Sequence, residues 1–152
     1  MRSINEAGLA LLRQAEGLRL TAYPDSAGLW TSGYGHRRGA YAGQTCTKDQ
    51  AEAWLHEDAA IAANAIEMAT GNGARVWLND NQFSALCVFV FNIGATAFRT
   101  STLRQRLVAG DLEAAPGEMR RWCHDTENGV KVISEGLVNR RAAEIRLWST
   151  PV

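Results

Sequence analysis

The spacing of apolar residues divides the chain into a helical start, a short turn-rich stretch and a long helical remainder. At the start, apolar residues recur at helical spacing at Ile4, Ala7, Leu11, Leu12 and Ala15. This repeat predicts an amphipathic helix, with Ser3 to Glu6 as its capping box and Gly17 as its stop. Glu16 therefore falls at the carboxyl end of this helix, where the helix dipole disfavours a negative charge.

The helical repeat gives way to short extended segments over residues 20–36. This stretch is rich in Tyr, Trp and Thr, and it is interrupted at Pro24, Gly28, Gly33 and Gly35. Such a composition is typical of short strands joined by tight turns. A second turn-rich stretch follows over residues 39–45.

Helical signals dominate from residue 47 onward. Capping-box patterns at 47–50 and 79–82 predict helices that run to about Ala65 and Ile93. Further apolar repeats predict helices over 101–109, 111–123 and 134–148, with a polar turn over 125–129.

These elements predict an α+β fold with two lobes. We expect a small N-terminal lobe with a short antiparallel sheet over about residues 17–50, a linking helix over about 47–65, and a larger C-terminal helical lobe over about 79–148. A groove between the lobes would hold the site. The 152 residues are expected to form a single domain over 1–152, which is long enough to bury about two thirds of its unfolded surface.

Composition and charge narrow the function classes. Sixteen basic and sixteen acidic residues cancel, so the chain offers no overall positive field, and we expect no nucleic-acid partner. No apolar run approaches the roughly 20 residues of a membrane span, and no secretory signal is visible, so we expect no stable membrane insertion.

The cysteines do not suggest a metal site. Cys46, Cys87 and Cys123 are odd in number and far apart, without the paired spacing of zinc ligands. We expect free thiols in a reducing compartment, with one bridge between two of them left open, and neither a metal nor an organic cofactor.

Candidate chemistry lies where the first helix meets the strands. Glu16 ends the helix, Asp25 follows after eight residues in a turn, and Thr31 follows after five more. Two carboxylates on different elements can face each other across a groove, as acid/base cleavage of a glycosidic bond requires.

Glu16, Asp25 and Thr31 at this spacing, followed by Gly33-Tyr-Gly-His36, resemble the phage-type lysozymes, the muramidase endolysins of glycoside hydrolase family 24. The resemblance continues in order to the end of the chain, in Asp80-Asn-Gln-Phe-Ser-Ala-Leu86, Phe91-Asn-Ile-Gly94, Phe98 with Ser101-Thr-Leu103, and Gly136-Leu-Val-Asn-Arg-Arg141 with Glu144 and Trp148. It implies a lysozyme-like fold and hydrolysis of the β-1,4 bond between N-acetylmuramic acid and N-acetylglucosamine in bacterial peptidoglycan.

The resemblance assigns a role to each residue of the triplet. Glu16 would protonate the leaving oxygen as the general acid. Asp25 would stay ionised, stabilise the oxocarbenium-like transition state and help to activate a water that Thr31 holds. The family suggests inversion at the anomeric carbon, and the separation of the two carboxyl groups decides between inversion and retention.

Supporting residues follow from the same resemblance. His36 would support the site, either as a structural histidine bonded to a carboxylate or through a direct catalytic influence. Arg140 or Arg141 would reach back to Glu16, with a surface salt bridge as the alternative for each.

The resemblance also places Phe91, Asn92 and Thr102 along the saccharide groove. Phe91 is equally well placed for the core, and we favour the core for most of its surface. After His36 come Arg37 and Arg38, where many relatives carry smaller or apolar residues at the groove edge.

Two other functions stay open. The chain could be a catalytically inactive muramidase-fold module that binds peptidoglycan or protein, or a lytic transglycosylase that leaves anhydro-muramic ends. We favour hydrolysis because Asp25 and Thr31 are both present. We expect a monomer, synthesised in the bacterial host cytoplasm, that reaches the cell wall after release through a membrane lesion made by a separate phage holin.

Overall fold

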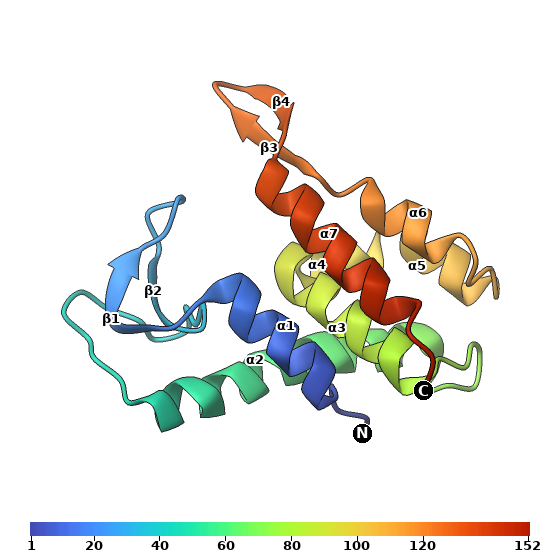
Figure 1. The fold of residues 1–152 in the computed structure, drawn as a ribbon, viewed down its shortest axis with the longest axis horizontal. Coiled ribbons are helices and arrows are strands. Elements are labelled where there is room, and N and C mark those ends of the chain that lie inside the picture. Colours follow the sequence, from blue (N-terminus) through green and yellow to red (C-terminus); the bar gives the residue numbers. More distant parts are fainter.

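The computed structural model describes residues 1–152 and confirms the α+β fold (Figure 1). The N-terminal elements are α1 (Glu6–Glu16), β1 (Arg19–Pro24), β2 (Trp30–Gly33) and α2 (Lys48–Thr70). They are followed by α3 (Asp80–Ile93), α4 (Ala95–Arg99), α5 (Thr102–Val108) and α6 (Ala115–Arg120). The chain ends with β3 (His124–Glu127), β4 (Val130–Ile133) and α7 (Glu135–Trp148).

The β1–β2 sheet is small and is supported by contacts with neighbouring segments. Its strands are antiparallel, with Tyr23 paired to Thr31, and the register is irregular between Arg19 and Tyr23. The turn-rich stretch runs along β1, where Ala22 donates to the carbonyl of Gln44 at 2.8 Å. A two-stranded sheet is marginal alone, so the contact of β2 with α2 supports it.

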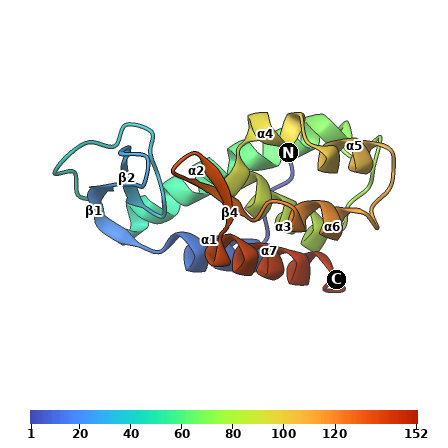
Figure 2. The ribbon, with the colours of Figure 1, turned by 90° about the horizontal axis from the view of Figure 1, so that it is seen from above.

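The core is built around α3, which is buried over most of its length. Helices α1, α2 and α7 all pack against it, and α1 and α7 lie side by side (Figures 1 and 2). Gly8 allows the close approach of α1, since a Cβ there would lie 3.0 Å from Cβ of Ser84 and closer still to Ile4. The interior glycine that weakens α1 by propensity therefore serves its packing.

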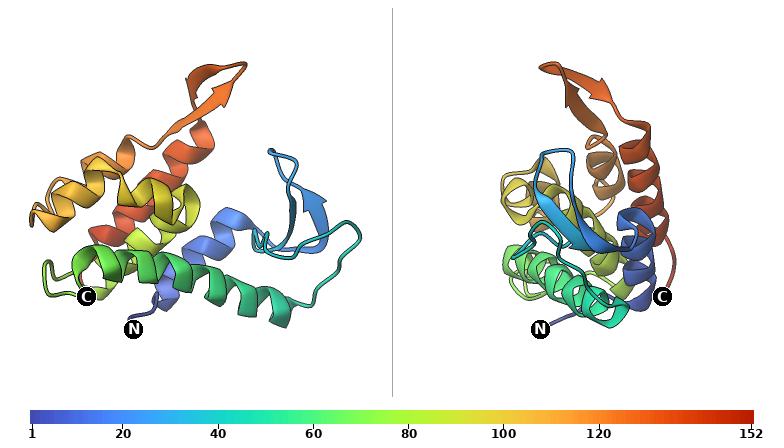
Figure 3. Two further views of the ribbon diagram at one scale, coloured as in Figure 1. Left: turned by 180° about the vertical axis from the view of Figure 1, so that it is seen from behind. Right: turned by 90° about the vertical axis from the view of Figure 1, so that its left-hand side faces the viewer.

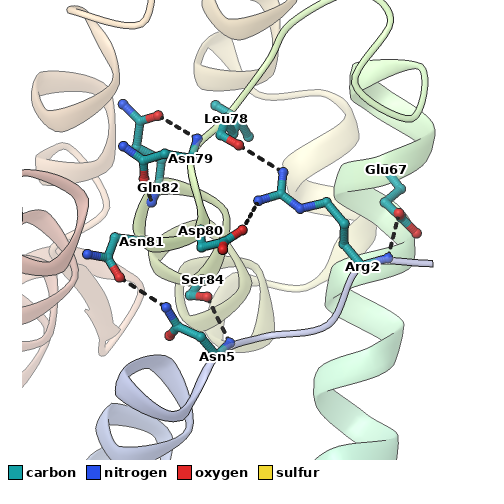
Figure 4. A network of polar contacts seen from close by, with 9 residues as sticks. All are labelled: Arg2, Asn5, Glu67, Leu78, Asn79, Asp80, Asn81, Gln82 and Ser84. Carbon is teal, nitrogen blue, oxygen red and sulfur yellow. Dashed lines mark hydrogen bonds and ion pairs between the residues drawn. The ribbon is translucent and has the colours of Figure 1, made fainter. Parts of the chain in front are cut away.

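A polar cluster ties the residues before α1 to the helices (Figure 4). The backbone N–H of Arg2 donates to Glu67, and its guanidinium donates to the carbonyl of Leu78 and to Asp80 at 2.9 and 2.8 Å. Asn5 donates from its side chain to Asn81 at 3.0 Å. These contacts fix where α1 begins.

The two ends of the chain meet at the same place. Asn81, which accepts from Asn5, donates to the backbone carbonyl of Thr150 at 3.0 Å. The residues before α1 and after α7 are thus held by one side chain of α3.

Several predicted boundaries need correction. The cap of α1 is Asn5, which accepts from the N–H of Gly8, and not Ser3. The capping boxes at Thr47 and Asn79 are confirmed, but α2 continues past Ala65 to Thr70, where Gly71 adopts the left-handed conformation that ends it. A short helix, α4, was not predicted.

The region predicted as helices and a polar turn over 111–129 is also different. Helix α6 begins only at Ala115, with Pro116 in its first turn, because proline lacks the N–H that an interior helical position needs. The predicted turn at 125–129 is instead most of β3 and the tip of the β3–β4 hairpin, where Asn128 and Gly129 both have positive φ. This hairpin projects away from the helices beyond the first turn of α7 (Figures 1 and 3).

All three cysteines are free thiols, with Cys46 and Cys87 buried. None of the helices combines the length and the apolar character that a membrane crossing requires.

Candidate functional site

Glu16 is the last residue of α1, and two distant parts of the chain hold its carboxyl group. On one side, Nη2 of Arg140 on α7 lies 2.8 Å from Oε1, with the two side chains only 12% and 21% exposed. On the other side lies Gly35, where a Cβ would sit 2.8 Å from Oε2. Gly35 also has a φ of +76°, so glycine suits both its backbone and the space that Glu16 takes.

Arg140 is in turn supported by a buried ionic cluster. Its Nε lies 3.6 Å from Oε1 of Glu144, which is fully buried, and Arg141 contacts the same carboxylate at 2.8 Å. Arg141 also donates to Oδ1 of Asn92 at 2.7 Å and packs its guanidinium over the ring of Phe89. The predicted choice between the two arginines is thereby resolved, because Arg140 meets Glu16 and Arg141 does not.

Burial governs the charge state of this cluster. It raises the pKa of Glu144 to about 7, against the opposing effect of the two arginines. It also lowers the pKa of Arg141, against the attraction of Glu144. Arginine keeps its proton under all ordinary conditions, so the close contacts describe an ion pair that burial makes costly to break.

Asp25 is held by its own turn. Its Oδ1 accepts from the backbone N–H groups of Ala27 and Leu29, both at 2.9 Å, and its Oδ2 lies 2.7 Å from Nη2 of Arg37. The hydrogen bond from Leu29 is the main cause that lowers the pKa of Asp25, partly opposed by burial and assisted by Ala27 and Arg37. The geometry therefore favours the ionised carboxylate.

Thr31 and Asp25 are both hydrogen-bonded to the backbone of Leu29. Its hydroxyl donates to the carbonyl oxygen of Leu29 at 3.0 Å, while the N–H of Leu29 donates to Asp25. Thr31 itself is buried and pairs with Tyr23 across the sheet. With its hydrogen directed at Leu29, the Thr31 oxygen keeps lone pairs that can accept a hydrogen bond.

His36 is buried and bonded to a carboxylate, which matches the interpretation of a structural histidine. Its Nδ1 lies 2.8 Å from Oδ2 of Asp58, and its ring stacks on Trp54 at 4.7 Å between centroids. Its backbone pairs in both directions with Ser32 on β2. Asp58 and Trp54, both on α2, were not singled out from the sequence.

A groove of about 300 Å³ opens beside Glu16, bounded by α2, α3 and the turn after β2. Phe91 and Asn92 line it together with Arg37, Arg38 and Asp58. Phe91 is half-buried against the core and also faces this groove. It therefore serves both of the positions considered for it, the core and the groove.

Thr102 lies elsewhere. It is exposed at the start of α5 and lines a separate polar cavity with Arg121, His124 and Lys131. The structure thus brings Glu16, Phe91 and Asn92 to one groove and Thr102 to another. No group of three or more His, Cys, Asp or Glu side chains is arranged to hold a metal ion.

Comparison with known proteins gives a consistent result. Residues 13–144 match the model of the family described as phage lysozyme. An endolysin from Acyrthosiphon pisum secondary endosymbiont phage 1 is 43% identical over 147 residues, which cover 97% of this chain and 98% of that relative.

Solved structures agree with the sequence comparison. The muramidase domain of SpmX from Asticaccaulis excentricus superposes with a TM-score of 0.90 at 34% identity, covering 99% of this chain and 100% of that one. An endolysin from Escherichia coli O157:H7 phage FAHEc1 superposes with a TM-score of 0.88 at 35% identity, covering 99% and 96%. The predicted lysozyme-like fold is confirmed.

Proposed function

Because the chain belongs to the phage lysozyme family, we propose that Glu16, Asp25 and Thr31 carry out its hydrolytic chemistry. The protein is an endolysin-type glycoside hydrolase that cleaves the β-1,4 bond between N-acetylmuramic acid and N-acetylglucosamine in peptidoglycan. The observation that supports the catalytic assignment best is the Glu16 carboxyl, which lies at a groove, pairs with Arg140 and packs closely against Gly35.

Glu16 acts as the general acid in this proposal. The Arg140 guanidinium takes one oxygen, Oε1, and leaves Oε2 to carry the proton. Held in this way, the acid can deliver its proton to the leaving glycosidic oxygen with little loss of orientation. A positioned general acid accelerates a reaction by about 10² to 10⁴.

Asp25 acts as the anionic partner. Its backbone hydrogen bonds keep it ionised, so it can stabilise the positive charge that develops on the sugar ring. A water that donates a hydrogen bond to Thr31 would attack the anomeric carbon, with Asp25 taking its other proton. This sequence of events inverts the configuration.

The stereochemical proposal has a direct test. Proton NMR of the first product from a soluble β-linked glycan should show the α-anomer before mutarotation. A first product with the β-anomer would exclude inversion.

The assignment of the acid is tested with Glu16→Gln, which keeps the shape and the contact with Arg140. We expect release of reducing ends from purified peptidoglycan to fall about a thousandfold or more, with an unchanged melting temperature. Glu6→Gln, an exposed change on the same helix, is the matched control. Lysis that persists in Glu16→Gln would show that another group is the acid.

Mass spectrometry of the digested wall separates the remaining alternatives. Hydrolytic ends are heavier by one water than the anhydro ends of a transglycosylase. Binding to the wall without any cleavage would support the inactive module.

We also propose that residues 1–152 act as one catalytic domain, as a monomer, and that a holin gives the protein access to the wall. Co-expression in a bacterial host should give lysis only when a holin is supplied. Light scattering during size-exclusion chromatography measures the oligomeric state.

A further inference from the structure

We propose that Arg37 is a specificity-determining residue, which covers Asp25 in the free enzyme and moves to a carboxylate of the substrate's peptide when peptidoglycan binds. This inference rests on the proposed function of the site. It concerns which glycan is preferred, and it involves a residue that lies outside the Glu16, Asp25 and Thr31 triplet.

The Arg37–Asp25 contact is close, but its arginine lies at the surface. Nη2 of Arg37 lies 2.7 Å from Oδ2 of Asp25, while the Arg37 side chain is 61% exposed. Oδ2 is buried, and no donor meets it with hydrogen-bond geometry. The guanidinium therefore covers this oxygen by charge attraction. Asp25 is only 12% exposed, but the exposed Arg37 side chain has no second ion-pair partner to hold it in place.

The contact opposes the role of Asp25 in cleavage. Oδ1 is occupied by the N–H groups of Ala27 and Leu29, so Oδ2 is the oxygen available to the sugar and the water. A cation at 2.7 Å from it offsets the negative charge that the transition state needs. Asp25 works best once Arg37 has moved.

The groove itself gives Arg37 another place to bind. Arg37 and Arg38 line the same groove as Glu16, and Arg38 is already paired with Glu57 at 3.1 Å. Arg37 faces both this groove and Asp25, and its contact with Asp25 is its only ion pair, so it can exchange one carboxylate for another.

The chemistry of the substrate fits this cation. Muramic acid carries a lactyl ether that is extended by a peptide with free carboxylates. Guanidinium pairs with such a carboxylate through two parallel hydrogen bonds, which are stronger than its contact with Asp25. A substrate that carries the peptide would draw Arg37 away and expose Oδ2, whereas a neutral glycan would leave Asp25 covered.

The test compares two peptidoglycan preparations that have the same glycan chains. One is native peptidoglycan, and the other has its peptide carboxyl groups converted to neutral amides by carbodiimide coupling to methylamine. For the wild type, we expect kcat/KM to be about tenfold higher on the native wall. Arg37→Ala should reduce this ratio to near one, and Arg37→Lys should keep part of it. Arg106→Ala, which removes an exposed arginine paired to Asp111 outside the groove, should leave the ratio unchanged.

A pH profile supplies a second measurement. Asp25 faces Arg37 and the N–H groups of Ala27 and Leu29, and Arg37 contributes to holding the pKa of Asp25 below its usual range. Activity is lost as the pH falls through this pKa, so Arg37→Ala should move the acid limb of kcat/KM to higher pH. Arg106→Ala should not move it.

The outcomes are distinct. A ratio of native to amidated wall that is the same in the wild type and in Arg37→Ala would overturn the proposal. An acid limb that does not move would show that Arg37 does not act on Asp25. If the wild type released no reducing ends from either wall, the proposed function would fail instead.

Discussion

Glu16 and Asp25 are held in opposite ways. The partners of Asp25 on its Oδ1 are backbone groups two and four residues further along the chain. The charged partner of Glu16 is Arg140, which comes from the last helix and depends on a buried cluster with Glu144 and Arg141. One carboxylate is positioned by a local turn, and the other is positioned by the completed fold.

The two carboxylates are therefore vulnerable to substitutions in different parts of the chain. A change far from the groove can disturb Glu16 through α7, but it should leave Asp25 in place as long as its turn forms. Three substitutions test this contrast, and each has a matched control.

The largest effect is expected for Glu144→Gln, which leaves the buried charge of Arg141 without its carboxylate. Removing one member of a buried ion pair costs about 3 to 5 kcal/mol. Urea unfolding should show a loss of this size, together with reduced activity because Arg140 loses its support. The double change Glu144→Gln with Arg141→Met should recover part of the stability, since no buried charge remains.

Glu118→Gln is the control for this prediction. It removes an acid with the same three-residue spacing from an arginine, but Arg121 is 67% exposed. Its effect should stay within about 1 kcal/mol. Equal losses in the two variants would show that burial of the Arg141–Glu144 pair has no special cost.

A smaller effect is expected for Arg140→Ala, which frees the Glu16 carboxyl while keeping the acid itself. A misplaced catalytic group can cost about a hundredfold in rate, so kcat should fall by about that factor on peptidoglycan. The acid limb of the pH profile that we assign to Asp25 should stay at the same pH. The control is Arg146→Ala, an exposed change on the same helix, which should have the kcat of the wild type. A wild-type kcat in Arg140→Ala would mean that Glu16 is held in position without α7.

The smallest effect distinguishes two glycines with the same backbone conformation. Gly28 follows Asp25 with a φ of +77°, and Gly35 contacts Glu16 with a φ of +76°. Alanine at either position should lower the free energy of unfolding by about 1 kcal/mol, because a side chain disfavours the left-handed conformation.

Only Gly35→Ala places a Cβ against Glu16, because Gly28 has no atom within 4 Å of its added Cβ. Gly35→Ala should therefore lose about tenfold more activity than Gly28→Ala at similar stability. Equal activities would show that the side chain of Glu16 adapts to the added methyl group.

The same contrast explains how much the sequence could predict. The turn around Asp25 was predictable because Pro24 and Gly28 mark it directly. The capping boxes at Thr47 and Asn79 were equally clear. The assignment of Arg140 to Glu16 was not, because neighbouring helical residues point about 100° apart and only the packing of α7 decides which one faces α1.

Other differences have separate physical causes. The dipeptide Asn128-Gly129 is typical of a hairpin turn. The hairpin was not predicted because the strand before this dipeptide, residues 124–127, is entirely polar. The bond between His36 and Asp58 joins two elements, and nothing local in either segment indicates it. Thr102 was assigned by resemblance alone, and the position of α5 directs it to another cavity.

The pairing of Glu16 with Arg140 also has a consequence for the order of folding. The two residues lie near opposite ends of the chain, so this contact closes a loop that contains almost every other element. Contacts of such long range form late and slow the folding rate. During synthesis on the ribosome, a chain that has made α1 and the β1–β2 sheet already has the turn of Asp25. The carboxyl group of Glu16, the proposed acid, is not oriented until α7 has emerged and docked. Catalytic competence would therefore depend on the docking of α7.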